Sequence, residues 1–338
     1  MSAPVILAVD GGNSKTDLAL VRADGGLLSL VRGPGSSPHH LGLEGGLEVL
    51  GTLLGEAARE LELPVAAAEL LMAGVDFPVE EETLREAVLA RRWAERVTVR
   101  NDTFAVLRAG TDRGWGVAVV CGAGINCVGV APDGRHARFP ALGPITGDWG
   151  GGQDVGLAAV FAAARSEDGR GPRTSLEQAV PAHFGLETPS ELAEAIHMGR
   201  IPQWRVVELP PIVLAEAASD AVAAEIVAHL ADEVVALARA ALARLGLTRE
   251  PLEIVLGGGV LQAGDPRLLG AIEEGLHELG PGLTVRLVES PPVVGAALLG
   301  LDELGAEAEA GARARSELGA AVDRLDSPAP TMAGRAGE

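Results

Sequence analysis

Apolar and polar positions change their spacing several times along the chain, and each spacing predicts an element. Two short apolar runs, at 5–9 and 17–21, have the length of strands, and a turn with two glycines joins them. Apolar residues then recur at helical spacing over 47–61, ahead of a continuous apolar run at 70–73 that is typical of a buried strand. Strands and helices that follow one another in this way predict an α/β fold.

The same reasoning extends over the rest of the chain. It predicts further strands at 27–31, 97–99, 117–120, 127–130, 253–256 and 283–288, and helices at 80–93, 104–109, 155–164, 215–245 and 291–304. Segments rich in glycine, proline and small polar residues separate these elements, as expected for turns and loops.

The pattern of the first strands starts again near residue 114. A strand, a turn at Gly122-Ala123-Gly124, a second strand and an Asp133-Gly134 turn repeat the order found at the N-terminal end. This weak duplication predicts two similar α/β domains, at 1–113 and 114–304. Residues 305–338 are rich in Ala, Glu and Arg without apolar periodicity, which predicts a solvated helix that continues into a partly disordered tail.

Composition narrows the classes of protein that remain. With 338 residues, 47% of them hydrophobic and 22% charged, the chain is long enough for two globular domains. A formal net charge of −20 argues against a nucleic-acid partner and against an anionic membrane surface. We find no signal peptide and no apolar segment long enough to span a bilayer, and the cysteines number only two, Cys121 and Cys127. We therefore expect a cytoplasmic protein.

The turn between the first two strands carries the first candidate chemistry. It reads Asp10-Gly11-Gly12-Asn13-Ser14-Lys15-Thr16, and Lys15 is the only lysine in the chain. Glycine lets backbone N–H groups approach a phosphate, lysine supplies a point charge, and Asp10 could hold a divalent cation through water. It is not a Walker loop, because Ser14 precedes the lysine and a strand follows it. The alternative is an ordinary hairpin whose glycines serve only the turn.

Two further glycine turns and two carboxylates complete the set of candidates. The turns are Gly122–Gly124, between two strands, and Gly257–Gly259, after another strand. Asp102 follows a strand, and Asp148 lies in a glycine-dense connection. Phosphate-binding hairpins together with a glycine turn beside a flat ring would suit ATP. The alternatives are that Asp102 caps the helix beginning near 104 and that Asp148 satisfies its own loop.

In order and spacing, these motifs resemble the BadF/BcrA-type ATPase family and, within it, the N-acetylglucosamine kinases. The resemblance covers roughly residues 4–304. It implies two ribonuclease H-like, actin-like ATPase domains with mixed five-stranded sheets flanked by helices and an ATP cleft between them. It also implies ATP and Mg²⁺ as cofactors, a sugar as substrate, and a possible homodimer.

The resemblance assigns a role to each candidate residue. Asp102 becomes the general base that accepts the proton of the sugar hydroxyl, usually O6, and Asp10 becomes the Mg²⁺ ligand through water. The residues expected to bind ATP are Asp10, Gly11, Gly12, Asn13, Ser14, Lys15, Thr16, Gly122, Ala123, Gly124, Ile125, Gly257, Gly258 and Gly259. Those expected to bind the acceptor are Ser37, Gly74, Asp76, Asn101, Asn126 and Asp148.

The chain departs from the pattern of these kinases around the second phosphate turn and the acceptor loops. Gly-Thr-Gly-Ser is usual where Gly122-Ala123-Gly124-Ile125 stands, so two hydroxyls that could bind phosphate are missing. Ser37-Pro38-His39-His40 replaces a loop that commonly carries Asn. These changes leave open a kinase for another polyol, an ATP-driven activator of a partner protein, and an impaired ATP-binding regulator. Iron–sulfur activators of the family use paired cysteines, but Cys121 and Cys127 flank a phosphate turn and fit small core residues better.

Overall fold

The computed structural model describes residues 3–248, 250–280 and 282–327, and these form two compact units. Unit 1 consists of Met1–Ala105 and Ser290–Glu338, and unit 2 is Val106–Glu289. Within the described residues, each helix is too short or too polar to cross a membrane.

Unit 1 is built on a five-stranded mixed sheet in the order β3-β2-β1-β4-β5. Its strands are β1 (Val5–Gly11), β2 (Lys15–Arg22), β3 (Leu27–Pro34), β4 (Val65–Met72) and β5 (Ala94–Asn101). β1, β2 and β3 are antiparallel neighbours, whereas β4 and β5 run parallel to β1. Strands β1, β2 and β4 are buried along nearly their whole length, as expected for strands with both faces covered.

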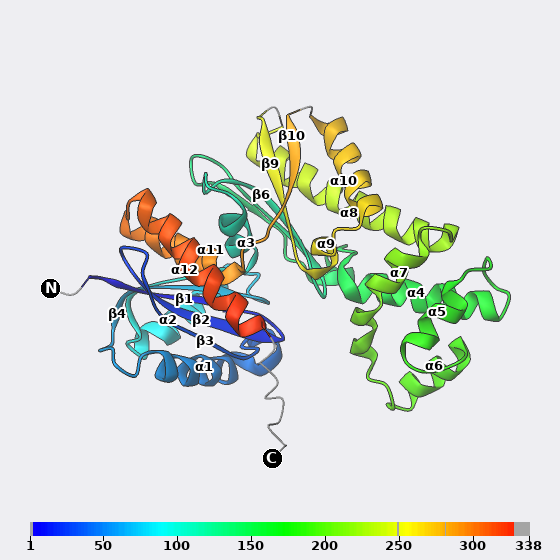
Figure 1. The fold of residues 1–338 in the computed structure, drawn as a ribbon, viewed down its shortest axis with the longest axis horizontal. Coiled ribbons are helices and arrows are strands. Elements are labelled where there is room, and N and C mark those ends of the chain that lie inside the picture. Colours follow the sequence, from blue (N-terminus) through cyan, green and yellow to red (C-terminus); the bar gives the residue numbers. More distant parts are fainter. Residues whose placement is uncertain (1–2, 249, 281, 328–338) are drawn as a thin grey trace, which may run out of the picture. The chain divides into compact units, whose positions relative to one another are not determined.

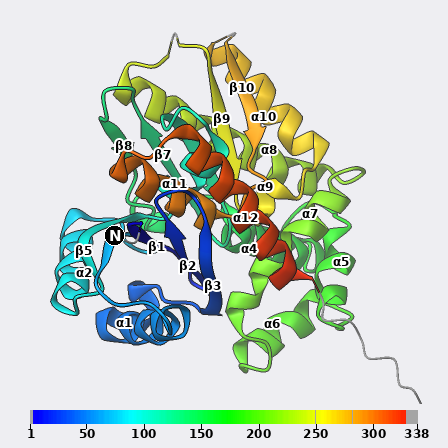
Figure 2. The ribbon, with the colours of Figure 1, turned by 60° about the vertical axis from the view of Figure 1, so that its left-hand side comes forward.

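Helices cover both faces of this sheet. α1 (Pro38–Ala57) and α2 (Pro78–Ala90) share one apolar core with the sheet, while α11 (Pro292–Leu304) packs on β1, β2 and β4 (Figure 1). α12 (Ala308–Asp326) lies against α11 and β3 (Figures 1 and 2). Gly300 allows the close approach of α11, since a Cβ there would lie 2.5 Å from Cγ2 of Ile6.

Unit 2 repeats the same sheet. Its strands are β6 (Gly116–Cys121), β7 (Ile125–Val130), β8 (His136–Arg138), β9 (Leu252–Gly257) and β10 (Leu283–Leu287), in the order β10-β9-β6-β7-β8. Here too the first three strands pair antiparallel and the last two run parallel to the first. The predicted α/β fold with two mixed five-stranded sheets flanked by helices is therefore confirmed.

The helices of unit 2 are more numerous. They are α4 (Gly151–Glu167), α5 (Leu176–His183), α6 (Pro189–His197), α7 (Pro210–Glu216), α8 (Ala221–Leu245), α9 (Gly259–Gln262) and α10 (Pro266–Leu279), with 3₁₀ turns η1 (Gly143–Ile145) and η2 (Gln203–Glu208). α8 packs on β6, β7 and β8, and α10 packs on α8 and β10. Helix α8 ends at Leu245, where the predicted helix ends, because Gly246 follows with φ 73°.

Some element boundaries differ from the prediction. The helix expected over 215–245 is two helices, because the Asp220 side chain accepts a hydrogen bond from the backbone N–H of Ala223 and starts α8 anew. α1 begins at Pro38 rather than at 47, with a break at Gly42, which has φ 71°. Pro38 stands at the start of the helix, where its missing N–H is tolerated.

The two units also differ from the predicted domains 1–113 and 114–304. The chain passes from unit 1 to unit 2 after Ala105, inside helix α3 (Thr103–Gly110) and ahead of the predicted boundary, and α11 belongs to unit 1 although its sequence follows the second sheet. The reason is packing: a Cβ on Gly295 of α11 would lie 1.9 Å from the carbonyl oxygen of Ala105, and a Cβ on Gly110 would lie 2.4 Å from Val255 of β9.

The segment expected to be a solvated tail contains an ordered helix with a buried face. Ala310, Ala314, Leu318, Ala321 and Val322 of α12 are buried. The spacing of 310, 314, 318 and 321 is a helical stripe, which we missed because three of its members are alanines. The expected disorder at 328–338 lies outside the described residues.

Candidate active site

The carboxyl ends of the parallel strands of unit 1 gather the first candidate residues at one edge of the sheet. Gly11 of β1 is in register with Met72 of β4, which in turn is in register with Asn101 of β5. Asp10 therefore lies one residue before this row and Asp102 one residue after it. Thr103 begins α3, so Asp102 stands between a strand and a helix.

Asp10 and Asp102 form the electrostatic centre of this edge. Burial raises the pKa of Asp102 to about 6, although the N–H of Thr103 lowers it in part. Burial also raises the pKa of Asp10 to about 8, and the neighbouring charges of Asp102 and Asp17 add to the effect. Lys15 and Arg32 oppose this shift. A desolvated carboxyl whose pKa is raised further by a neighbouring carboxyl, as at Asp10, would be stabilised as a carboxylate by a cation.

Lys15 is an exposed cation at the turn of this hairpin. Its side chain is 54% exposed, and Nζ lies 3.6 Å from Oδ2 of Asp17. Asp17 is buried and is bound more closely by Arg32, through Nε at 2.6 Å and Nη2 at 2.9 Å. Lys15 is thus weakly paired and can still take an anionic ligand.

The hairpin glycines have a structural role of their own. A Cβ on Gly11 would lie 2.4 Å from Sδ of Met72, and one on Gly12 would lie 2.9 Å from the carbonyl oxygen of Lys15. Packing therefore disfavours a side chain at both positions, at Gly12 because the atom it would meet is backbone and at Gly11 unless Met72 moves. Thr16 is buried and donates its hydroxyl to Oγ of Ser36 at 2.8 Å. Of the residues expected to bind phosphate here, Asn13, Ser14 and Lys15 are the exposed ones.

Several residues expected to bind the acceptor in unit 1 also hold this edge together through hydrogen bonds. Asn101 is buried, donates Nδ2 to Oδ1 of Asp76 at 2.9 Å, and accepts from the hydroxyl of Thr103 at 2.6 Å. Ser37 is also buried and donates its hydroxyl to the carbonyl oxygen of Ala73 at 2.8 Å. Asn101 thereby joins the segment carrying Asp102 to Asp76.

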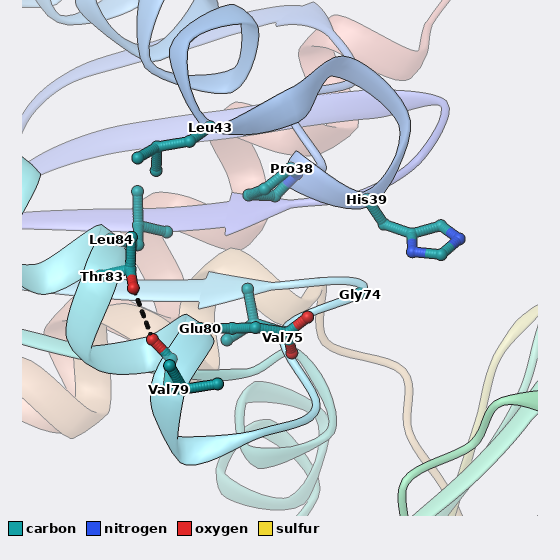
Figure 3. Close-up of a pocket in the computed structure, with 9 residues that line it drawn as sticks. All are labelled: Pro38, His39, Leu43, Gly74, Val75, Val79, Glu80, Thr83 and Leu84. Atoms are coloured by element: carbon teal, nitrogen blue, oxygen red, sulfur yellow. Dashed lines mark hydrogen bonds between the residues drawn. The ribbon is translucent and has the colours of Figure 1, made fainter.

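An apolar pocket, which the sequence did not reveal, adjoins these residues. It lies between the first turns of α1 and α2, has a volume of about 180 Å³, and is lined by Pro38, His39, Leu43, Gly74, Val75, Val79, Glu80, Thr83 and Leu84 (Figure 3). The carboxylate of Glu80 accepts from the N–H groups of Asp76 at 2.8 Å and Phe77 at 2.9 Å, so this wall is tied to Asp76. Val79 on this wall is 69% exposed, which is unusual for valine. Its exposure is visible only in the structure, and no sequence motif marks the pocket.

In unit 2, three glycine segments are joined by backbone contacts. The turn at Gly122–Gly124 accepts hydrogen bonds from the start of α4, Gly152 N to Gly122 O at 2.8 Å and Gln153 N to Ala123 O at 2.9 Å. Gly258 has φ 85°, and a Cβ there would lie 2.4 Å from the carbonyl carbon of Cys121. The second phosphate turn and the Gly257–Gly259 turn are thus neighbours, as their expected roles require. Gly151 and Gly152 were not expected to belong to this group; the glycine-dense stretch 143–156 was the available signal.

Some of these glycines have no structural reason to be glycine. At Gly122, Gly124 and Gly259 a Cβ would meet no other heavy atom of the described residues within 4 Å, and their φ values are not positive. At Gly151, by contrast, φ is 76° and a Cβ would lie 2.5 Å from the backbone of Gly124. Open space over a glycine backbone allows a ligand to approach N–H groups closely.

The remaining candidates of unit 2 lie beside this turn. The Asn126 side-chain oxygen accepts from the N–H of Cys127 at 2.7 Å, and the carboxylate of Asp148 accepts from the Thr146 hydroxyl. Ile125 is buried and packs under Gly150, where a Cβ would lie 2.9 Å from its Cδ1. Ile125 therefore stabilises the turn by packing against Gly150. Trp149 stacks on His229, with ring centroids 4.0 Å apart, so its indole face is used within the unit.

Both cysteine thiols are buried in the core of unit 2. Burial raises the pKa of Cys121 to about 12 and raises that of Cys127 further above its ordinary value. A thiol in this state is a poor metal ligand. The buried position therefore favours a packing role over an iron–sulfur cluster.

The comparisons with known proteins agree with this geometry. Residues 7–300 match the model of the BadF/BadG/BcrA/BcrD ATPase family. A relative from Clostridium acetobutylicum named N-acetylmuramic acid/N-acetylglucosamine kinase is 28% identical over 262 residues, which are 76% of this chain and 85% of the relative. A Dictyostelium discoideum N-acetyl-D-glucosamine kinase is 25% identical over 325 residues, covering 89% of this chain and 99% of that protein.

Solved structures share the fold. A Chromobacterium violaceum protein provisionally assigned as an N-acetylglucosamine kinase matches with a TM-score of 0.68 and 24% identity, over 88% of this chain and 99% of that one. A ROK family glucokinase from Streptomyces griseus, solved with glucose and AMPPNP, matches with a TM-score of 0.53 and 18% identity, over 87% of this chain and 98% of the other.

Proposed function

This chain belongs to the BadF/BadG/BcrA/BcrD ATPase family and is a sugar kinase, and we propose that it transfers the γ-phosphoryl of ATP to O6 of N-acetylglucosamine or a related amino sugar. The observation that carries the proposal is the edge of unit 1 where Asp10, Asp102 and the exposed head group of Lys15 gather. Phosphoryl transfer depends on positioning and on cations rather than on covalent chemistry, and this edge offers groups for both tasks.

Asp102 is the proposed general base. A base works best when its pKa lies near the working pH, and burial raises the pKa of Asp102 to about 6. It is then largely ionised at pH 7 and can accept the proton of a sugar hydroxyl. Asn101 positions it, since the amide of Asn101 is bonded to Asp76 on one side and to Thr103 on the other.

Asp10 is the proposed residue that would hold Mg²⁺, through water. The fit rests on its environment, a desolvated carboxyl beside a second one, whose pKa is raised to about 8 without a cation. Magnesium commonly uses one or two carboxylates and keeps water and phosphate for its other positions. When bound it would neutralise charge on the phosphates. The ammonium of Lys15 would also neutralise charge on the phosphates.

Unit 2 supplies the proposed nucleotide site. The support is the open space over Gly122, Gly124 and Gly259, which neither packing nor backbone conformation explains. The hydroxyls that related kinases carry in this turn are absent, so backbone N–H groups must do more of the phosphate binding. The start of α4 holds the turn in shape for that task through Gly152 and Gln153.

For the acceptor, the apolar pocket beside Gly74 favours a sugar with an apolar substituent such as an N-acetyl group. Its wall is tied through Glu80 to Asp76 and through Asp76 to Asn101, next to the proposed base. The pocket supports an acylated amino sugar over an unsubstituted polyol, because burial of apolar surface is its main means of binding.

The test is a panel of acceptors with ATP and Mg²⁺: N-acetylglucosamine, glucosamine, N-acetylmannosamine, glucose and simple polyols. We expect phosphorylation of at least one N-acetylated hexosamine, with the product phosphorylated at O6 by NMR. D102N should lower kcat about 10²- to 10⁴-fold, the usual contribution of a general base, with a small change in KM for ATP. D133N is the matched control, since Asp133 lies on an exposed turn paired with Arg135.

Two outcomes would contradict the kinase activity, and a third would contradict the role of Asp102. ATP hydrolysis that ignores every acceptor would favour an activator or switch of a partner protein. ATP binding without turnover would favour a regulator. Activity of D102N near that of the wild type would remove Asp102 from its role.

A further inference from the structure

Helix α12 contacts Arg32 of β3 through its last residue, Asp326, and Arg32 in turn binds Asp17 of β2, two residues after Lys15. The polar contacts that dock α12 include Arg313 Nη1 to Asp24 at 2.9 Å, Glu317 accepting from the N–H of Leu27 at 2.8 Å, and Asp326 accepting from Nη1 of Arg32. The first two contact the β2–β3 hairpin at its far end. The third contacts Arg32, which also binds Asp17.

Arg32 connects α12 to a buried carboxylate. Its Nε and Nη2 bind the two oxygens of Asp17 at 2.6 and 2.9 Å, and its Nη1 is left for Asp326. Asp17 is 1% exposed and Arg32 is 21% exposed. A planar guanidinium can bind one carboxylate with a fork and a second with its remaining nitrogen, which lysine cannot do.

We propose that Asp326 is a positioning residue for Lys15: by holding Arg32 on Asp17, it keeps the ammonium of Lys15 available for the phosphates of ATP. The inference rests on the proposed function of this hairpin in binding ATP. It gives α12 a role in the reaction, although α12 lies beyond the matched segment 7–300.

The physical basis is competition for one carboxylate. Oδ2 of Asp17 accepts from Arg32 at 2.9 Å and lies 3.6 Å from Nζ of Lys15, so the two cations share it unequally. A buried carboxylate without a close cation is costly. If Arg32 lost its anchor on α12 and moved away, Lys15 would close on Asp17 in its place. Its ammonium would then be less available to a phosphate.

The sign of the effect separates this proposal from simple charge removal. Asp326 also attracts Lys15 directly, so loss of its negative charge would by itself free the ammonium, reduce the repulsion of an anionic nucleotide and lower KM for ATP. Loss of the anchor should raise KM for ATP. We expect D326N to raise KM for ATP about two- to fivefold, the size typical of a partly exposed ion pair, while kcat and KM for the sugar change little. D326E should restore the wild-type value.

R313Q is the matched control. It removes another exposed ion pair of α12, that with Asp24 and Glu317, without touching Arg32 or Asp17. D326N and R313Q should lower the melting temperature by similar amounts, and only D326N should change KM for ATP. Equal changes of KM in both variants would mean that α12 acts through stability alone.

Lys15 also allows a test that does not need turnover. Because it is the only lysine in the chain, reductive ¹³C-methylation labels one side chain, plus the N-terminal amine, and keeps its charge. We expect the Lys15 methyl resonance to shift in D326N and to stay in place in R313Q, and to respond to added ATP in the wild type. An unchanged resonance in D326N, or a KM for ATP that is unchanged or lower, would overturn the proposal. If no sugar were phosphorylated but the resonance still responded to ATP and to D326N, the proposed function would fail and the role of Asp326 would stand.

Discussion

At the scale of single residues, glycines with the same sequence context have different physical roles. Gly11 and Gly12 stand where a phosphate loop needs glycine, yet neighbouring atoms already lie within 3 Å of the place of a Cβ. Gly122 and Gly124 have room for one. Packing disfavours a side chain at the first pair, whereas the second pair is free of that restriction and available to a ligand.

This difference gives a prediction for two glycines that touch each other. G124A should leave the free energy of unfolding within about 1 kcal/mol of the wild type, the usual range for glycine-to-alanine changes in permitted conformations, but raise KM for ATP at least tenfold. G151A should destabilise by more, ~2–3 kcal/mol, because its φ is 76° and its Cβ would meet Gly124. Urea unfolding and ATP kinetics check both. A G124A enzyme with normal ATP kinetics would contradict the proposed nucleotide site.

A second prediction at this scale concerns Val79 at the apolar pocket. V79F should partly fill the pocket at little cost in stability, because the side chain is 69% exposed. We expect kcat/KM for N-acetylglucosamine to fall about tenfold, a usual size for a steric change in an apolar pocket, with glucosamine unaffected. V79A, which leaves the pocket open, is the control. Equal losses for both sugars would mean that the pocket does not receive the acetyl group.

At the scale of elements, helix α11 covers the first sheet over a buried carboxyl group. Glu69 of β4 is 1% exposed, and its Oε2 has no hydrogen-bond partner among the described residues. Burial raises its pKa to about 8, a hydrogen bond with Glu303 of α11 adds to this, and Arg100 opposes it. The pair is therefore held together by a proton at neutral pH.

This proton predicts a pH-dependent stability of unit 1. The folded state holds the proton more tightly than the unfolded state, whose pKa is 4.5, so the contribution is fully present below pH 4.5 and is lost as pH rises through about 8. E69Q keeps a donor toward Glu303 without a charge. At pH 8.5 the free energy of unfolding of E69Q should be ~2 kcal/mol higher than that of the wild type, and at pH 5 the two free energies should be nearly equal. Urea unfolding at both values, with the exposed E44Q as control, is the measurement; equal stability at pH 8.5 would contradict it.

At the scale of the whole molecule, unit 1 is discontinuous in sequence. Its sheet is built by the N-terminal residues, but α11, which covers one face, arrives after the whole of unit 2. Val293, Val294, Ala297, Leu298 and Leu301 of α11 are buried. The N-terminal residues alone would leave this face of the sheet in water.

We therefore expect residues 3–105 alone to fail to fold and to bind a hydrophobic dye. A chain that joins 3–105 to 290–327 by a short flexible linker should fold cooperatively, because Gly295 lies against Ala105. Residues 106–289, which are contiguous, serve as the comparison. Circular dichroism melts and ¹H–¹⁵N spectra are the measurements. A cooperative melt of 3–105 would show that α11 is dispensable.

The elements were largely predictable because they depend on local spacing. Every strand of the two sheets except β8, the C-terminal end of α8 and the duplication followed from apolar runs and turn residues. The buried face of α12 was not predicted because it consists mostly of alanine, which is less hydrophobic than leucine or valine. The pocket at Val79 could not be predicted, because the side chains that line it come from α1, α2 and the segment at Gly74 and share no sequence pattern.

The α/β class, the two similar halves and the short list of chemical groups, among them Asp10, Lys15 and Asp102, could be predicted from the amino-acid sequence. These features depend on residue type and on spacing along the chain. The folded structure was needed to show which glycines are free to meet a ligand, that Ser37, Thr16 and Ile125 pack or hydrogen-bond inside the protein, and that Arg32 joins Asp17 to α12. Such roles depend on which atoms from distant segments fill the space around a side chain, and packing alone determines that.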